Sequence, residues 1–467
     1  MNKDIFKGFS DIKADDCLIE KTKNQIMQPQ QKKKSALAIR KLAFAAIPFV
    51  IVLTVLTVLL SNSFLTNIFV ISAKAEDLME GINPQNIDVS NSITDNFKNS
   101  TQNFSINLFK QSYKSGENNL ISPTSAFLAL GMTANGASGQ TLKEFTNVLG
   151  KYGLTVDDLN KAYKAYADEL NEKRGKTVLN ISNSIWYNIG FKANREFLQK
   201  NADFFEAEAN SLDFSDKNSV NNINKWVQNN TNNKINKIID NIDPLDVMFL
   251  INTINFEAKW QTPFEKAKKG IFFDSLKSIP KDGYSVTDEN ANAMFMKLED
   301  VNLDCIETQN ETAVLFPYND KRFAFLGVLP NETEINDYVN NMSENTIPDI
   351  INQMSNEKIT VFLPKFKVES SNLLNDALKN MGLVTAFGDA DFSKMSEDKE
   401  ALYISSVRQK TFIQVDELGT KAGAATAVGV EKCAVFQPIN FNRPFVYAII
   451  DTKTNLPIFI GTMENPQ

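Results

Sequence analysis

The side chains that could do chemistry in this chain are restricted, because histidine is absent. Histidine is the usual general base for an activated serine or cysteine and the commonest metal ligand. The three cysteines, Cys17, Cys305 and Cys433, lack the paired spacing of a metal site and cannot form an extensive disulfide framework. We therefore expect no catalytic residues, no metal and no cofactor, and we do not expect an enzyme.

The most unusual segment is residues 417–430 (ELGTKAGAATAVGV), in which nearly all side chains are small. As a β-strand it would place Thr420, Ala422 and every second residue after them on one face, with Lys421 on the other. One face could then be buried in a sheet without burying a charge. Composition alone also allows a flexible Gly/Ala linker on an exposed loop.

Several motifs, in order along the chain, resemble those of the serpin family. The family's hinge runs Glu, any residue, Gly, Thr and then small residues, and it is matched here by Glu417, Gly419, Thr420, Ala422, Gly423, Ala424, Ala425 and Thr426. Residues 439–449 (INFNRPFVYAI) are similar to the family's C-terminal signature. Shorter matches lie at residues 119–125 (NLISPTS), 224–227, 230–231, 252–264 and 363–366. The resemblance covers the chain from about residue 95 to its end.

The resemblance implies a suicide inhibitor of serine proteases, with cysteine proteases as a second target class. In this family the protease cuts an exposed loop and stays attached as an acyl complex while the loop inserts into the central sheet. By family spacing the cut falls between Cys433 and Ala434, or, in a register one residue shorter, after Lys432. Cys433 favours an elastase-like or subtilisin-like target, and Lys432 favours a trypsin-like one.

Serpins keep a hydrogen-bonded cluster beneath the sheet at the place where it must open. The resemblance assigns Ser122, Ser125 and Asn252 to this cluster, and its usual histidine falls at Gln409. A glutamine amide can both donate and accept hydrogen bonds, so the cluster is expected to survive without the pH dependence of a histidine.

The resemblance assigns Trp260 and Glu417 to the region where the sheet opens. The lysine that commonly pairs with this glutamate aligns with Asn292, so Glu417 is expected to lack its ion pair and the sheet to open more readily. Without the family, Trp260 would be an ordinary core aromatic, and Ser122 and Ser125 would be helix caps.

Hydrophobic periodicity places helices early in the domain and strands later. Apolar residues around Phe104–Phe109 and Phe127–Leu130 lie at helical spacing, and Ser122 followed by Pro123 marks a helix start. Residues 248–256, 359–368, 411–415 and 445–450 are apolar or alternating and rich in Val, Ile and Phe, which predicts strands. We expect an α+β fold with helices packed on large, mostly antiparallel sheets, which is the serpin fold that the resemblance implies.

An N-terminal attachment precedes the domain. Residues 42–60 are uncharged and apolar, and as a helix they span roughly 28 Å, which predicts a transmembrane signal anchor. Basic residues at 32–34 and 40–41 place a polar head, residues 1–41, in the cytoplasm. The serpin domain, residues 95–467, would then lie outside a single-pass cell-membrane anchor, after an extracellular spacer at residues 61–94. Secretion after signal-peptide cleavage near Ala75 is the alternative.

The net charge of −7 makes nucleic acid an unsuitable partner, because phosphate binding needs a basic face. We expect a monomer whose partner is the target protease. A non-inhibitory serpin that acts as a binding or chaperone-like surface protein is the main alternative, although its hinge would typically carry bulky or charged residues. A membrane-anchored hydrolase is disfavoured, because the chain lacks histidine and a conventional nucleophile motif.

Overall fold

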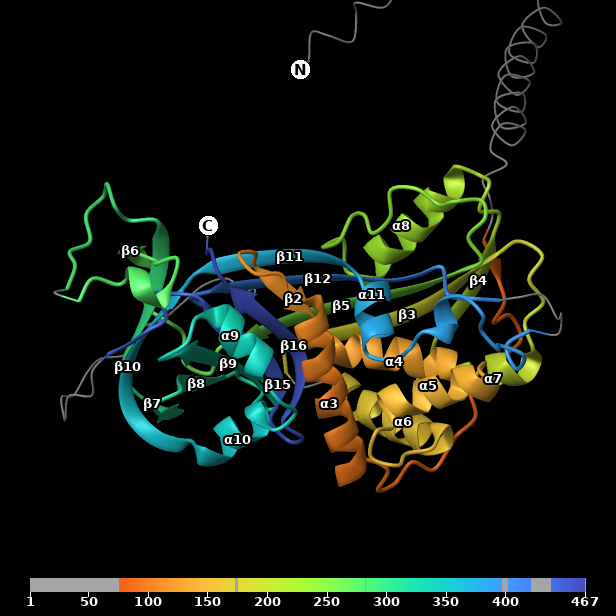
Figure 1. Cartoon of the computed structure of the whole chain (residues 1–467), viewed down its shortest axis with the longest axis horizontal. Helices are drawn as coiled ribbons and strands as arrows, with labels where there is room; N and C mark the ends of the chain where they lie inside the picture. The colour runs from red at the N-terminus through yellow and green to blue at the C-terminus, as the bar shows by residue number, and fades with distance from the viewer. Residues whose placement is uncertain (1–74, 173–174, 282, 397–401, 421–437, 467) are drawn as a thin grey trace, which may run out of the picture. The chain divides into compact units, whose positions relative to one another are not determined.

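The computed structural model describes residues 75–466 except 173–174, 282, 397–401 and 421–437. Within these residues two β-sheets enclose one large hydrophobic core, and helices pack on both faces of the seven-stranded sheet (Figure 1). Helices α4 to α7 lie on one face of this sheet, and α8 lies on the other. The predicted α+β class, with helices packed on large, mostly antiparallel sheets, is therefore confirmed.

The seven-stranded sheet, sheet A, contains the predicted strands at residues 248–256 and 411–415. Its spatial order is β1 (Glu76–Asp77), β4 (Glu208–Leu212), β3 (Val178–Asn188), β5 (Met248–Lys259), β13 (Gly419–Thr420), β12 (Ser406–Asp416) and β11 (Phe366–Leu373). The short strand β13 lies between β5 and β12 at one end only, and elsewhere β5 pairs directly with β12.

The second sheet, sheet B, carries the C-terminal end of the chain. Its spatial order is β14 (Ile439–Asn440), β10 (Ser355–Pro364), β7 (Ala293–Glu307), β8 (Glu311–Pro317), β9 (Phe323–Pro330), β15 (Phe445–Asp451), β16 (Leu456–Met463) and β2 (Asn119–Ile121), and β6 (Lys268–Gly270) pairs with β7. Every residue of β9, β15 and β16 is buried, so these three strands lie within the core.

Several helices begin at a residue whose side chain caps the first turn. The helices are α3 (Asp95–Ser112), α4 (Pro123–Ala134), α5 (Gly139–Leu149), α6 (Val156–Asn171), α7 (Arg195–Phe205), α8 (Asn218–Asn230), α9 (Ile335–Asn341), α10 (Thr346–Gln353) and α11 (Asn375–Asn380). Ser122 caps α4, with Pro123 in the first turn, as predicted. Thr155 and Asp158 form a capping box at the start of α6.

The predicted strand at residues 359–368 is wrong in one respect, because it is two strands in different sheets. Strand β10 ends at Pro364 in sheet B, and β11 begins at Phe366 in sheet A. Leu363 and Phe366 are both buried, so the hydrophobic pattern continues across the corner and conceals it. Proline lacks the N–H group that a continuing ladder would need, which favours an end to β10 at this residue.

Residues 76–93, expected to be part of an exposed spacer, pack against the domain. Strand β1 pairs antiparallel with β4, and so covers a strand that would otherwise expose unpaired backbone groups at the sheet edge. Four apolar side chains of this segment are partly buried on the core, namely Leu78, Met79, Ile82 and Ile93. The predicted membrane segment, residues 42–60, lies outside the described residues, and no helix in the described ranges is long and apolar enough to span a bilayer.

This packing makes a prediction about truncation. A domain that begins at Glu76 should fold, because β1 and the serpin-like motifs are all retained. A domain that begins at Thr94 keeps the cap of α3 but loses β1 and the four apolar side chains, so its free energy of unfolding should fall by about 3 kcal/mol. Urea unfolding followed by circular dichroism measures both. Failure of the longer form to fold would refute the separation at residue 75, and equal midpoints would mean that residues 76–93 add no stability.

Candidate functional site

The candidate site is the seam in sheet A between β5 and β12. The two strands pair in parallel where residues 406–411 face residues 249–254. Beyond Thr411 they separate, and β13 lies between them, antiparallel to both. The seam is thus closed over one part of its length, and over the other part it is occupied by the hinge residues Gly419 and Thr420.

Both residues of β13 fit this slot closely. Thr420 is 1% exposed, and its hydroxyl lies 2.6 Å from the hydroxyl of Tyr318. Gly419 has a φ of +152°, and a Cβ atom there would collide with the carbonyl oxygen of Ala258 on β5. The inward face predicted for Thr420 is therefore the face it presents in the structure, and only glycine fits at position 419.

Trp260 holds the turn that leads from β12 into β13. Its backbone N–H donates to the carbonyl of Leu418 at 3.0 Å, and its indole N–H donates to the carbonyl of Asp416 at 2.8 Å. The indole ring stacks on Tyr318, with ring centroids 4.7 Å apart. Trp260 and Tyr318 therefore fix the turn and the buried threonine together.

Glu417 has an ion-pair partner, which corrects the expectation that it would lack one. Its carboxylate lies 2.9 Å from the Lys365 ammonium and accepts a hydrogen bond from the N–H of Ala267. Burial alone would raise the pKa of Glu417, but these hydrogen bonds outweigh it, so the pKa lies below its ordinary value. The side-chain amide of Asn292 instead accepts a hydrogen bond from the N–H of Phe272 and donates one to its carbonyl oxygen.

At the closed part of the seam, Gln409 on β12 joins three elements. Its amide N–H donates to the carbonyl of Ser122 at 2.8 Å and to the side-chain oxygen of Asn252 at 3.1 Å. Its amide oxygen accepts from the N–H of Ser122 at 2.8 Å. Gln409 and Asn252 are each 1% exposed. Because Asn252 lies on β5, this is a buried side-chain hydrogen bond across the seam.

Asn252 extends the network beyond β5. Its amide donates to the carbonyl of Ser125 at 3.0 Å and to the side-chain oxygen of Asn183 on β3 at 2.6 Å. The Ser122 hydroxyl donates to the carbonyl of Ile458 in sheet B. The Ser125 hydroxyl is buried and has no hydrogen-bond partner within the part of the chain that the structure describes. The network therefore ties β3, β5, β12, α4 and β16 together, with one polar group left over.

The structure brings four of the five predicted cluster residues together, namely Ser122, Ser125, Asn252 and Gln409. Trp260 lies at the other end of the seam, beside β13. Sequence reasoning missed Asn183, Tyr318 and Lys365. Lys365 lies in a motif that the resemblance had identified, whereas no sequence signal marks Asn183 or Tyr318. The remaining hinge residues and the predicted reactive centre lie outside the described residues. They are Ala422, Gly423, Ala424, Ala425, Thr426, Lys432, Cys433 and Ala434.

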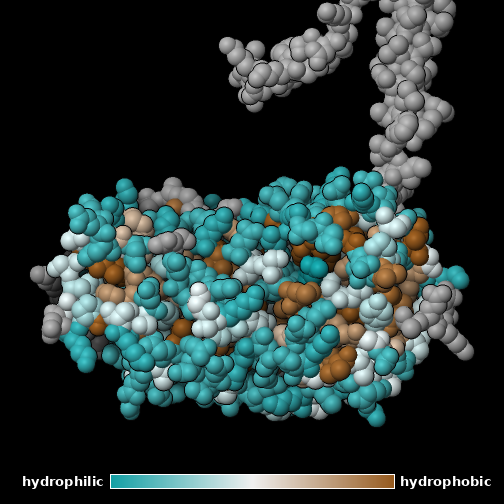
Figure 2. Space-filling view, turned by 45° about the horizontal axis from the view of Figure 1, so that its top comes forward, coloured by the Kyte–Doolittle hydropathy of each residue, from teal (hydrophilic) through white to brown (hydrophobic). Residues whose placement is uncertain are grey.

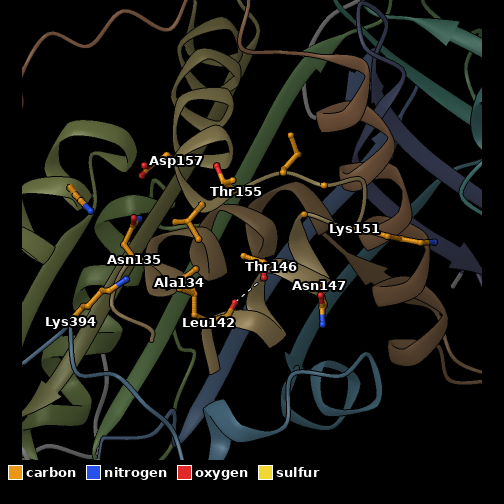
Figure 3. Close-up of a pocket in the computed structure, with 14 residues that line it drawn as sticks. Ala134, Asn135, Leu142, Thr146, Asn147, Lys151, Thr155, Asp157 and Lys394 are labelled. Carbon is orange, nitrogen blue, oxygen red and sulfur yellow. Dashed lines mark hydrogen bonds between the residues drawn. The ribbon is translucent and has the colours of Figure 1, made fainter. Parts of the chain in front are cut away.

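A separate cavity of about 710 Å³ lies among α4, α5 and the start of α6 (Figure 3). Its lining includes Lys151, Lys394 and Asp157. The buried Asn135 amide is already satisfied by reciprocal hydrogen bonds with Asn160. None of the predicted site residues lines this cavity.

The comparisons with known proteins confirm the predicted serpin fold. A family model described as Serpin (serine protease inhibitor) matches residues 99–466. Neuroserpin from Rattus norvegicus is 30% identical, with 78% of this chain and 90% of neuroserpin covered. An uncharacterized serpin-like protein from Thermococcus kodakarensis is 31% identical, with 79% of this chain and 85% of that protein covered.

Two solved structures of tengpin, a thermophilic serpin, are 40% identical to this chain. The native state gives a TM-score of 0.75, with 84% of this chain and 100% of tengpin covered. The latent state gives a TM-score of 0.68, with 82% of this chain and 100% of tengpin covered.

The seam network predicts that Gln409→His creates a pH dependence. A histidine at this buried position is disfavoured in its charged form, so its folded pKa falls below its unfolded value of about 6.5. The unfolded state then binds more protons, and stability is lost as the pH falls below about 6.5, by at most ~1.4 kcal/mol per pH unit. Urea unfolding at pH 5.5 to 8, compared with the natural protein, measures this.

The control is Lys143→His, at an exposed residue of α5, where no such slope is expected. The natural protein has no histidine to titrate in this range. Equal slopes for the two variants would contradict the buried hydrogen-bonding role of position 409.

Proposed function

The chain belongs to the serpin family, and on that premise we propose that it is a suicide inhibitor of serine proteases. The cleaved loop would insert between β5 and β12 while the protease is still attached. The observation that carries this proposal is β13, because Gly419 and Thr420 already pair with both strands of the seam. Further insertion is then the extension of an existing strand.

The register of β13 assigns a slot to each residue that would follow. Thr420 pairs with Ala258 on β5 and Val415 on β12. If the same antiparallel register continued, Ala422 would face Phe256 and Ile413. These neighbours are buried, so the slot accepts a small side chain and excludes a large or charged one.

The energetic balance favours insertion once the loop is free. Insertion would replace the direct pairing of residues 406–411 with residues 249–254 by two antiparallel ladders, one on each side of the new strand. Roughly ten additional hydrogen bonds at about 0.5–1.5 kcal/mol each supply on the order of 10 kcal/mol. Before cleavage both ends of the loop are held in the fold, which opposes this gain.

The hydrogen bond between the Gln409 and Asn252 side chains would hold the closed part of the seam together. Breaking a buried hydrogen bond costs about 1–3 kcal/mol if its groups stay unpaired. The continued register would bring Thr426 opposite both residues, where its hydroxyl could pair with the freed amides and with the unpartnered Ser125 hydroxyl. The free-energy barrier would thus come from breaking this hydrogen bond as the seam opens. In the inserted state, new hydrogen bonds to Thr426 would replace it.

The chemistry at the reactive centre belongs to the protease. Its nucleophile would attack the carbonyl of Cys433, forming an ester to the loop and releasing a new amino terminus at Ala434. The C-terminal fragment would stay in place, since β15 and β16 are buried in sheet B. We favour an elastase-like or subtilisin-like target, with a trypsin-like target if the cut follows Lys432, and a cysteine protease as a further class.

We further propose that the domain acts as a monomer outside the cell. It would be held at the membrane through residues 42–60, or it would be secreted after cleavage near Ala75. The alternative of a non-inhibitory, chaperone-like surface protein is weakened by the small residues that follow Thr420 in the sequence, because a hinge that does not insert has no need of them.

The first experiment tests inhibition and register together. The domain from Glu76 onward is incubated with elastase-like, subtilisin-like and trypsin-like proteases and then analysed on denaturing gels and by mass spectrometry. A stable complex with a released peptide that begins at Ala434 is expected. A peptide that begins at Cys433 would move the target class to trypsin-like proteases. Cleavage without any complex across the panel would contradict inhibition and favour the non-inhibitory alternative.

The buried slot of Thr420 predicts that Thr420→Arg converts the inhibitor into a substrate. Thr420 is 1% exposed in β13, so a charge at this position would have to be desolvated both there and in the inserted strand. Insertion would then slow, and the protease would hydrolyse the acyl bond first. The fraction of protease in complex should fall while loop cleavage continues. Lys421→Arg, on the proposed outward face, is the matched control and should leave the complex yield unchanged. An unchanged yield for Thr420→Arg would overturn the insertion mechanism.

A further inference from the structure

A groove at the β6 end of the domain combines an apolar lining with a cluster of lysines. It has a volume of about 340 Å³ and lies among β6, the segment that follows β6, β7, β10 and β14. We call it the β6–β14 groove. This volume is at the small end of the range of about 300–1,000 Å³ that is usual for small-molecule sites. None of the seam residues described above lines it.

The lining is apolar and in part already fixed in position. Phe295 is buried and Phe362 is half-buried, and both line the groove. Tyr284 and Val286 remain 42% and 47% exposed. The Tyr284 hydroxyl accepts a hydrogen bond from the Asn442 amide at 2.8 Å, so this ring is held at the rim. Figure 2 shows hydrophobic residues set among hydrophilic ones at the end of the domain where Figure 1 places β6.

The charge of the groove is positive, in contrast to the chain as a whole. Four lysines line it, namely Lys266, Lys268, Lys269 and Lys297, against one carboxylate, Glu265. Lys269 pairs with Asp288 and Lys297 pairs with Glu299. Lys266 and Lys268 form no ion pair with any described residue. Both ammonium groups could thus meet an anion beside an apolar surface, and Lys268 also attracts Glu299, whose pKa is lowered by Lys297 and in part by Lys268.

Lys297 also shows how an anion would be oriented. Its ammonium lies 5.9 Å from the centroid of the Phe362 ring, so a cation already sits over an aromatic face inside the groove. A flat ring packed on Phe362 and Phe295 would carry its acidic group toward the lysines at the rim. Apolar contact would supply most of the binding, and the charged group would set the orientation.

We propose that the β6–β14 groove binds an amphipathic organic anion, that is, an aromatic body bearing a carboxylate or sulfonate. The ligand would contact Asn440 and Asn442, which lie on and just after β14, the strand that follows the proposed reactive loop. The proposal concerns binding to the intact domain and does not depend on protease inhibition.

The test uses 8-anilinonaphthalene-1-sulfonate as a fluorescent probe of the folded domain from Glu76 onward. We expect saturable binding at one site. N-phenyl-1-naphthylamine, which has the same apolar body without the sulfonate, separates the contribution of charge. The double variant Lys266→Ala/Lys268→Ala should weaken sulfonate binding about tenfold and leave the neutral probe unaffected. This difference should shrink in ~1 M salt.

The matched control is Lys143→Ala/Lys161→Ala, which removes the same charge from exposed positions on α5 and α6. A second variant, Val286→Asp, places a carboxylate in the groove at an exposed position and should abolish sulfonate binding without disturbing the fold. Equal sulfonate affinities for the groove and control double variants would overturn the proposal, as would full binding by Val286→Asp or the absence of a saturable site. These readouts involve no protease, so they remain valid whether or not the domain inhibits one.

Discussion

The pairing of β5 with β12 is the interaction on which the rest of the structure depends. The two strands are parallel neighbours over residues 406–411 and 249–254, but they part at the other end, where β13 lies between them. Two antiparallel ladders around an inserted strand would contain more hydrogen bonds than the single parallel pairing that is present. Sheet A is therefore paired as it stands, and the proposed mechanism adds a further strand at this seam.

Two sets of contacts hold the seam in this condition, and they act at opposite ends. Gln409 bonds Asn252 across the closed part, and the network continues to Asn183 and to the start of α4. At the other end Trp260 and the ion pair between Glu417 and Lys365 fix the turn into β13. The first set keeps the strands together, while the second keeps the hinge aligned with the slot. A loop released by cleavage would therefore begin to insert from a fixed register.

The absence of histidine is consistent with inhibition by strand insertion. An inhibitor that works through strand insertion needs no general base, because the protease supplies the nucleophile and the proton transfers. What the inhibitor must supply is a sheet that can open and a segment that fits the opening. The amide of Gln409 provides donor and acceptor groups at the opening without a titrating charge, so the seam network should not respond to pH near neutrality.

The sequence by itself determined the fold class, predicted the buried side of Thr420, and indicated four residues that meet at the closed seam. These are encoded locally, in periodicity, in side-chain size and in short motifs whose order matches a family. The sequence could not determine that Lys365 replaces the expected partner of Glu417, that residues 359–368 turn a corner between two sheets, or that residues 76–93 cover the edge of sheet A. Nor did it indicate Asn183 or Tyr318. Each of these depends on which distant strands become neighbours, and a hydrophobic pattern records whether a residue is buried but not what it is buried against.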